Sequence, residues 1–182
     1  MQKILLFCLA VAFIACNSKK ENDKTDGDKM DNKETSTKIT NMSGYDVSSS
    51  SFVIGDSKNA EAVLALWKAF DDNQLDGIGA HIADSMELHF ADGSMMNGPR
   101  DSAVAAAKQF RGMYSTVKST VHAIVALKNT VTNENWVDIW GTEVHTMNGK
   151  TDSLHLHEAW RFNNDGKADR MYQFGAPALP MK

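Results

Sequence analysis

The sequence predicts one α+β domain in which three N-terminal helices pack on one face of a strongly curved, mainly antiparallel sheet. Three observations predict this class. Apolar residues recur at helical spacing over 58–73 and again after Asn97, strand-like segments fill residues 119–174, and an Asn148-Gly149 pair joins two of these segments. Helices followed by a run of antiparallel strands are typical of a sheet that is covered on one side.

The N-terminal stretch predicts export and a lipid anchor. In MQKILLFCLAVAFIAC, the basic Lys3 precedes an apolar run that ends shortly before Cys16. This pattern is typical of a secretory signal peptide over residues 1–15, and the run is too short to span a bilayer, which needs about 20 residues. Phe13-Ile14-Ala15-Cys16 resembles the lipobox of bacterial lipoproteins, which implies cleavage before Cys16 and lipidation of that cysteine. We therefore expect a lipid-anchored membrane protein of the bacterial cell envelope, with its domain in the periplasm.

Residues 16–55 differ in composition from the domain expected at 56–180. Lys, Asp, Asn, Ser and Thr dominate there and aliphatic residues are nearly absent. Such a segment buries too little apolar surface to offset the entropy of the chain. We expect a flexible polar tether, in which Phe52-Val53-Ile54 is either part of the tether or a short edge strand.

Charge and cysteine content narrow the classes of function. The net charge of −4 argues against nucleic acid as a partner, because a nucleic-acid binder shows a basic stripe. Cys8 lies in the removed peptide, so the lipidated Cys16 leaves no thiol for a disulfide or a metal site. The chain carries no phosphate loop and no dinucleotide motif, and we expect no cofactor.

The first expected helix spans residues 58–73 and begins at a cap from Asp56 or Ser57. Its apolar residues follow the i, i+3, i+4, i+7 spacing of a helix that buries one face. They are Val63, Leu66, Trp67 and Phe70.

A short second helix is expected at 76–82 with Asp76 as its cap, followed by a strand at 86–90. The third helix begins at Asn97-Gly98-Pro99, because proline is well accommodated in the first helical turn. Met95 and Met96 fall in the loop before it, either at the mouth of a pocket or as mobile loop residues.

The second half predicts four antiparallel strands, at 119–128, 136–147, 151–162 and 168–174. A two-residue Asn148-Gly149 turn pairs Met147 with Lys150, and this register assigns side chains to faces. The face toward the core then holds Val137, Ile139, Gly141, Glu143, Leu154, Leu156, Glu158 and Trp160. The opposite face holds Trp136, Asp138, Trp140, Thr142, His155, His157 and Arg161.

Two stretches resemble the NTF2-like (SnoaL-like) superfamily, which includes the bacterial ketosteroid isomerases. QLDGIGAHIAD at 74–84 is similar to the isomerases' second-helix region, and EAWRFNNDGK at 158–167 is similar to their late hairpin. The resemblance implies a cone-shaped fold with a mostly apolar pocket, and it places Glu158 where the isomerases keep a protonated acid. It also places Phe90 at the position of the catalytic base and Leu66 at that of the partner Tyr, so isomerase activity is not expected.

The pocket that the resemblance implies has a predicted lining. We expect Leu66, Phe70, Leu88, Phe90, Phe110, Tyr114, Ile139, Leu156, Glu158, Trp160 and Tyr172. Burial among apolar residues favours the neutral form of Glu158, which then donates to a ligand carbonyl, acts as a general acid, or is satisfied by its neighbours. Glu143 lies nearer the strand end, at the pocket rim or in solvent. Tyr114 and Tyr172 can supply hydroxyl groups.

The opposite face predicts a homodimer. Trp136, Trp140, His157 and Arg161 would form an exposed aromatic patch in a monomer, and these residue types are enriched at the centres of interfaces. His89 points outward by alternation with Leu88 and Phe90. His155 and His157 share a face with Asp138, but two histidines alone are not a specific metal motif, because zinc sites need three or four ligands. We therefore expect no metal.

Three functions remain open. The first is a membrane-anchored domain that binds a small, mainly apolar molecule without established catalysis. The second is a SnoaL-type acid–base enzyme, an isomerase, cyclase or hydratase that uses Glu158 with help from Tyr114, Tyr172 or His89. The third is a structural envelope protein that binds another protein through Trp136 and Trp140.

Overall fold

The computed structural model describes residues 37–39 and 42–178. Contacts divide the chain into Met1–Lys33 and Glu34–Lys182, and every described residue belongs to the second unit. The expected signal peptide at 1–15, the lipidated Cys16 and much of the expected tether lie outside the described residues. None of the described helices is long and apolar enough to cross a membrane.

Eight strands form one sheet, in the order β1-β2-β5-β6-β7-β8-β3-β4. Two α-helices and one 3-10 helix lie between residues 57 and 111. The elements in chain order are β1 (Thr37–Lys38), β2 (Ser51–Ile54), α1 (Ser57–Asp71), η1 (Leu75–His81), β3 (Ile82–His89), β4 (Met95–Pro99), α2 (Arg100–Arg111), β5 (Thr116–Asn129), β6 (Asn135–Met147), β7 (Lys150–Phe162) and β8 (Ala168–Pro177).

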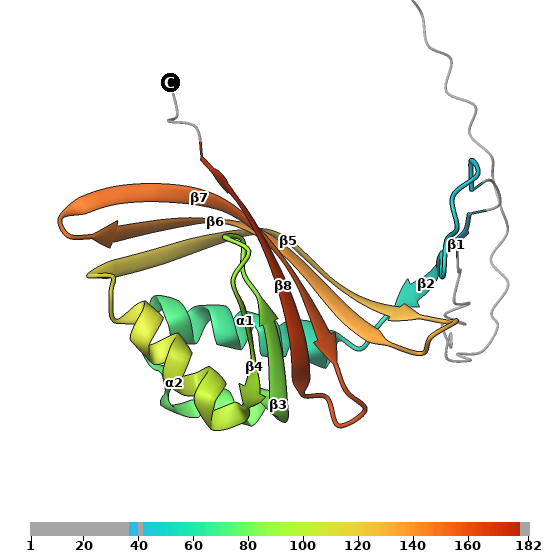
Figure 1. Cartoon of the computed structure of the whole chain (residues 1–182), viewed down its shortest axis with the longest axis horizontal. Coiled ribbons are helices and arrows are strands. Elements are labelled where there is room, and N and C mark those ends of the chain that lie inside the picture. Colours follow the sequence, from blue (N-terminus) through green and yellow to red (C-terminus); the bar gives the residue numbers. More distant parts are fainter. Residues whose placement is uncertain (1–36, 40–41, 179–182) are drawn as a thin grey trace, which may run out of the picture. The chain divides into compact units, whose positions relative to one another are not determined.

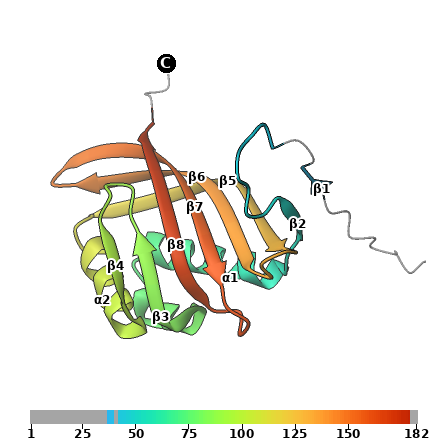
Figure 2. The same cartoon turned by 45° about the vertical axis from the view of Figure 1, so that its right-hand side comes forward.

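The long strands β5 to β8 arch over the helices, which lie on the concave side of the sheet (Figure 1). Within the described residues, β3 against β8 is the one parallel pair, and the other neighbours are antiparallel. In the turned view, β3 and β4 extend the sheet beside β8 (Figure 2). The α+β class with a curved, mainly antiparallel sheet is therefore confirmed.

The helical elements follow the predicted order, but the second differs in kind and an additional strand precedes the third. α1 begins as expected, with the Asp56 carboxylate accepting a hydrogen bond from the Lys58 amide. The second helix is the 3-10 helix η1, whose N-cap is Gln74, and Asp76 accepts from Lys108 on α2 instead of capping. Two strands, β3 and β4, lie between η1 and α2, where the sequence predicted one, so the three helices are not one uninterrupted N-terminal group.

Strand β4 was missed, because its sequence, MMNGP, consists largely of residues typical of turns. It pairs with β3 in a register that sets Met96 opposite Leu88 and Pro99 opposite Ser85. Pro99 is the last strand residue and α2 begins one residue later. Pairing with a neighbouring strand, a long-range effect, overrides the local turn signal.

The hairpin between β6 and β7 has the predicted register. Met147 pairs with Lys150 and Ile139 with Glu158, and both turn residues have positive φ, as a type I′ turn requires. The face assignment follows, since the side chains of Val137 and Ile139 are fully buried. Alternation along these two strands therefore fixes which residues face the helices.

The sheet reaches further toward the N-terminus than the boundary expected at residue 56. Phe52-Val53-Ile54 is part of β2, which pairs with β5. It is not the edge, because β1 pairs with its other side. Thr37–Lys38, expected to belong to the tether, thus forms two residues of strand.

Candidate functional site

A cavity of about 520 Å³ lies between the concave face of the sheet and the helices. Its size is that of a typical small-molecule site. Many of the residues predicted to line a pocket do line this cavity: Leu66, Phe70, Leu88, Phe90, Phe110, Leu156, Glu158 and Trp160. They come from α1, β3, α2 and β7 and from the residue after β3, so the cavity exists only when these elements are assembled.

Three predicted pocket residues are not part of the lining. Ile139 is fully buried beneath it, in the core. Tyr114 follows α2 and packs edge-on against Phe110, 5.3 Å between ring centroids. Tyr172 lies on the opposite face of the sheet, stacked on His89 at 4.6 Å. The face of Tyr172 depends on the register of β8, which no turn signal in the sequence defined.

Several lining residues were not among those predicted. Trp67 shares the predicted apolar face of α1, and Met86 and Met171 lie on the inner faces of β3 and β8. Gln173 follows Met171 by two residues, so alternation would have found it once the face of β8 was known. Met96 lines the cavity from β4, whereas Met95 is 64% exposed, because neighbouring strand residues point to opposite sides.

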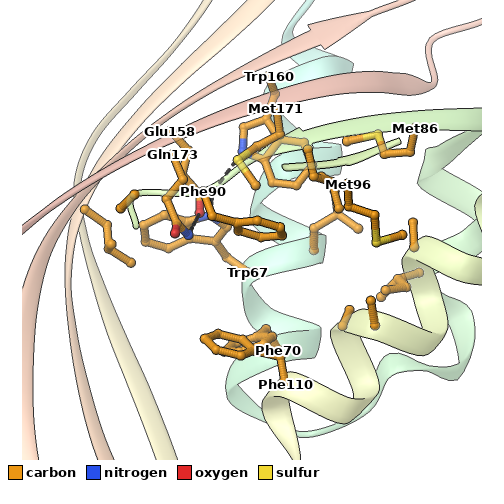
Figure 3. A pocket seen from close by; sticks show the side chains of 18 of the residues that line it. Trp67, Phe70, Met86, Phe90, Met96, Phe110, Glu158, Trp160, Met171 and Gln173 are labelled. Carbon is orange, nitrogen blue, oxygen red and sulfur yellow. Dashed lines mark hydrogen bonds between the residues drawn. The ribbon is translucent and has the colours of Figure 1, made fainter. Parts of the chain in front are cut away.

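Glu158 forms the polar centre of the cavity. Its Oε2 accepts from the indole nitrogens of Trp67 at 2.6 Å and Trp160 at 2.9 Å, and its Oε1 accepts from the Gln173 amide at 2.9 Å (Figure 3). The side chain is buried, with 6% of the residue exposed. All three partners donate to it, which suits a carboxylate. These bonds give no support to the expectation of a neutral acid that donates to a ligand.

Gly141 allows the Trp67 indole to reach Glu158. A Cβ on this glycine would lie 2.7 Å from the Trp67 ring and 2.8 Å from the backbone oxygen of Thr120. β6 therefore carries no side chain where the indole crosses it. Glycine is therefore required at this position by the close approach of Trp67 and not by a turn.

Glu143 lines the cavity further along β6, with 12% of its side chain exposed. The expectation of a position in solvent is therefore wrong, because the curvature of the sheet carries this strand end over the helices. Burial raises the pKa of Glu143, and a hydrogen bond with His145, 2.8 Å between Oε1 and Nδ1, opposes this effect. Burial and the nearby Glu143 charge raise the pKa of Tyr114. Sequence reasoning missed His145, although it shares the inner face with Glu143 by alternation.

The isomerase positions are apolar, as the resemblance implied. Phe90 and Leu66 both line the cavity, and neither side chain can accept or donate a proton. Ser119, which also lines it, donates to the Asp71 carboxylate from both its amide and its hydroxyl at 2.8 Å. Among the described lining residues, the ionisable side chains are thus carboxyl groups, and none of them is a base at the Phe90 position.

The opposite face of the sheet carries stacked aromatic rings. Trp140 stacks on His157 at 4.7 Å and His157 on Phe174 at 5.6 Å, on three adjacent strands. Trp136 stacks on Tyr172 at 6.2 Å. Trp140 is 39% and Phe174 58% exposed. His89 points to this face as expected and bonds to Glu87.

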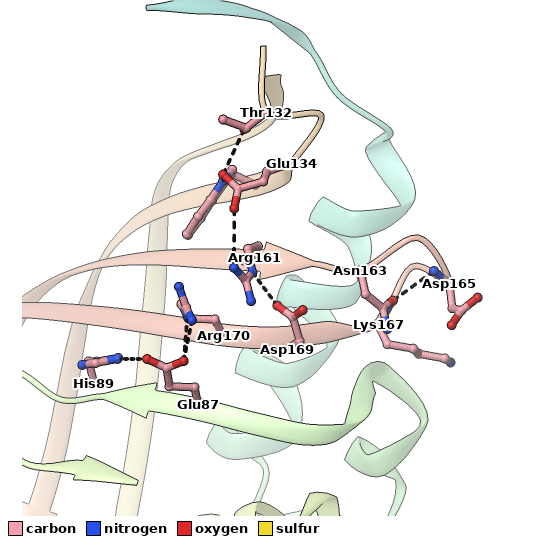
Figure 4. Close-up of polar contacts among 11 residues, drawn as sticks. Glu87, His89, Thr132, Glu134, Arg161, Asn163, Asp165, Lys167, Asp169 and Arg170 are labelled. Atoms are coloured by element: carbon pink, nitrogen blue, oxygen red, sulfur yellow. Dashed lines mark hydrogen bonds and ion pairs between the residues drawn. The ribbon is translucent and has the colours of Figure 1, made fainter. Parts of the chain in front are cut away.

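Charged groups on the same face are paired. Arg161 bonds to Asp169 and reaches Glu134, and Arg170 bonds to Glu87 (Figure 4). His157 bonds to Asp138 and His155 to Thr142. Among the described residues no three His, Cys, Asp or Glu side chains gather to form a metal site.

Comparison with known proteins assigns this domain to a family. Residues 63–171 match the model of the SnoaL-like domain family. Because the match covers more than half of the chain, the protein belongs to this family. No curated protein sequence matches it.

Solved structures share the NTF2-like fold at low identity. One is an LEH-like epoxide hydrolase of M. tuberculosis, 12% identical, with 66% of this chain and 84% of that chain covered and a TM-score of 0.56. Another is an NTF2-like protein of unknown function from Burkholderia pseudomallei, 19% identical, with 66% and 92% covered and a TM-score of 0.55. AusH from Aspergillus nidulans is 10% identical, with 69% and 88% covered and a TM-score of 0.54. At these identities the likeness extends to the fold alone.

Proposed function

We propose that this domain binds a small, mainly apolar molecule in the cavity on the concave side of its sheet. The observation that carries the proposal is the cavity of about 520 Å³ whose apolar wall is interrupted by the buried Glu158. An apolar pocket with few, well-held polar groups is the usual form of a small-molecule site. Trp67, Trp160 and Gln173 hold the carboxylate in place and so fix where a polar atom of the ligand would lie.

Filling the cavity tests the proposal. The full chain is purified from its own host, and small molecules released on denaturation are identified by mass spectrometry. Leu156→Trp places an indole in the cavity and should abolish co-purification, whereas Leu64→Trp adds the same group on the exposed side of α1 and should leave it unchanged. Unchanged release from the Leu156→Trp variant would contradict binding in this cavity.

The second candidate, acid–base chemistry on a carbonyl compound, is favoured by the Glu143–His145 pair. A buried carboxyl group with a raised pKa beside an imidazole is suited to proton transfer. Glu158, the acid expected from the sequence, is instead engaged by three donors. Turnover of a polyketide-like or steroid-like enone should be lost in Glu143→Gln and kept in Glu61→Gln, a matched change on the exposed surface of α1. Equal turnover in both variants would contradict this role for Glu143.

The outer face supports a homodimer, and a second copy of the chain is the partner we propose for it. Exposed Trp140 and Phe174 share this face with charges of both signs, Arg161 and Asp169 among them. A face that carries both signs is self-complementary about a two-fold axis. Trp140→Glu should convert a dimer to a monomer in sedimentation experiments and leave ligand binding unchanged. A wild type that sediments as a monomer would contradict the homodimer. If another envelope protein then co-purifies with it, the third function expected from the sequence, binding of another protein through this face, would replace the homodimer.

The membrane anchor rests on the sequence alone. The lipobox-like segment before Cys16 supports lipidation of that residue in a bacterial host. Labelled palmitate should enter the wild type and Cys8→Ser but not Cys16→Ser. Labelling of Cys16→Ser would contradict the anchor.

A further inference from the structure

The polar atoms of the cavity are unequally divided between donors and acceptors. Side-chain donors of the lining are largely used within the protein: Trp67, Trp160 and Gln173 donate to Glu158, Ser119 to Asp71 and Ser94 to Asp92. One amide hydrogen of Gln173 is left over. The hydrogen-bonding groups that remain available to a ligand are therefore mainly carboxylate oxygens, which accept hydrogen bonds.

The charges of the lining have one sign. Glu143, Glu158 and Asp92 line the cavity, and no Lys, Arg or His is among its described lining residues. Arg111 is a buried cation whose guanidinium donates to the carbonyls of Phe70, Asp71 and Tyr114. It is not part of the lining, and it lies 5.9 Å from the Phe70 ring centroid. A buried carboxylate without a cationic partner is costly, so Glu158 is a group that a bound cation would stabilise.

Aromatic rings surround this carboxylate. Trp67 and Trp160 approach it directly, and Phe90 lies beside it, with Phe70 and Phe110 further along the cavity (Figure 3). The faces of such rings attract cations, most strongly where water is excluded. The Oε1 atom accepts one hydrogen bond and Oε2 two. An acceptor position thus remains on Oε1 for an N–H group.

We infer, on the premise that the proposed binding function holds, that the ligand is a protonated amine with an apolar body. The ammonium group lies against Glu158 between the aromatic rings, and the apolar body fills the space toward Phe70 and Phe110. An anionic molecule of the same shape is excluded, because its charge would be buried among carboxylates without a counter-ion. This inference names the chemical class of the ligand that the cavity selects.

Three probes of one shape test the inference on the purified full chain by titration calorimetry. Phenylbutylamine, phenylbutanol and phenylbutanoate share their apolar body and differ in charge. The amine should bind about tenfold more tightly than the alcohol, and the carboxylate should bind more weakly still. Tighter or equal binding of the alcohol would overturn the inference and leave the proposed function standing. Absence of binding by all three probes, together with no molecule released from the native protein, would overturn the proposed function itself.

Variants that remove a single charge test whether Glu158 causes the preference for the amine. Glu158→Gln should lower the affinity for the amine to that for the alcohol. The matched change Glu61→Gln on the exposed surface of α1 should leave the tenfold preference for the amine intact. If a folded Glu158→Gln variant still prefers the amine to the alcohol, the placement of the ammonium group at Glu158 would be overturned. If Glu158→Gln does not fold, as judged by circular dichroism, the Trp67→Phe variant keeps the carboxylate and should retain the preference for the amine. The order of the three probes on the wild type decides the inference without any variant.

Discussion

The two faces of strands β6, β7 and β8 are built from the same segments of sequence and have opposite character. On the concave face, Glu158 accepts from neutral N–H groups and lies in an apolar cavity. On the convex face, Arg161 and Arg170 are each paired with carboxylates, and the rings of Trp140 and His157 stack with their planes 6° apart. Alternation of side chains along a strand thus sets an apolar cavity and a surface of stacked aromatic rings and ion pairs back to back. The difference teaches that the same strands leave Glu158 without a cationic partner inside and pair the arginines with carboxylates outside. The proposed binding and dimer formation rest on this contrast.

The largest expected effect comes from filling the space where Trp67 crosses β6. Gly141→Ala should lower the free energy of unfolding by about 3 kcal/mol, because its Cβ would collide with both an indole and a backbone oxygen. Urea denaturation measures it. Gly77→Ala is the control, since a Cβ there meets no neighbour, and it should change stability by no more than about 0.5 kcal/mol. Equal costs at both glycines would show that Trp67 does not depend on the bare strand.

Two valines on β6 give a matched pair across the sheet. Val137 is fully buried on the concave face, and Val144 is 42% exposed on the convex face. Val137→Ala should cost about 2 kcal/mol of unfolding free energy through lost burial and a residual cavity, and Val144→Ala about 0.5 kcal/mol or less. Chemical denaturation of both variants under one set of conditions measures the contrast. Similar costs would contradict the assignment of the faces.

Two tryptophans that donate hydrogen bonds to glutamates allow the two faces to be compared by the cost of losing one hydrogen bond. Trp67→Phe removes a donor at 2.6 Å from the buried Glu158, and Trp136→Phe removes one at 3.4 Å from the part-exposed Glu134. The first change should cost about 1–2 kcal/mol, because it leaves a buried carboxylate under-bonded, and the second about 0.5 kcal/mol or less. Thermal unfolding of the two variants gives the difference. A larger cost for Trp136→Phe would reverse the proposed roles of the two faces.

The smallest effect is a difference in pH dependence between an inner and an outer carboxyl group. Burial raises the pKa of Glu143, so its ionisation opposes folding increasingly as the pH rises from its unfolded pKa of about 4. Hydrogen bonds from His89 and Arg170 lower the pKa of Glu87, so its stabilisation is present at neutral pH and is lost as the pH falls through the folded pKa. Relative to the wild type, Glu143→Gln should therefore gain stability from pH 4 to 7 and Glu87→Gln should lose it. Unfolding curves across this range measure the two slopes, and slopes of the same sign would contradict the assigned environments.

Much of the sheet followed from local signals. The Asn148-Gly149 turn defined the register of β6 and β7, and the faces of Ile139 and Glu158 with it. β4 did not follow, because Asn97-Gly98-Pro99 has the local signature of a turn and becomes a strand only beside β3. The face of Tyr172 was predicted wrongly for a related reason, because β8 is positioned by neighbours on both sides, one of them the distant β3.

The sequence by itself determined the class of the fold, the helical face of α1 and the two faces of the central hairpin, because turn chemistry and side-chain periodicity are local properties. Only the tertiary structure decided that Trp67, Trp160 and Gln173 converge on Glu158, and that the end of β6 curves far enough to bury Glu143. These contacts join elements as many as 91 residues apart, and curvature is a property of the whole sheet. Periodicity names the residues on each face, but the packing of the sheet against its helices determines which of them meet.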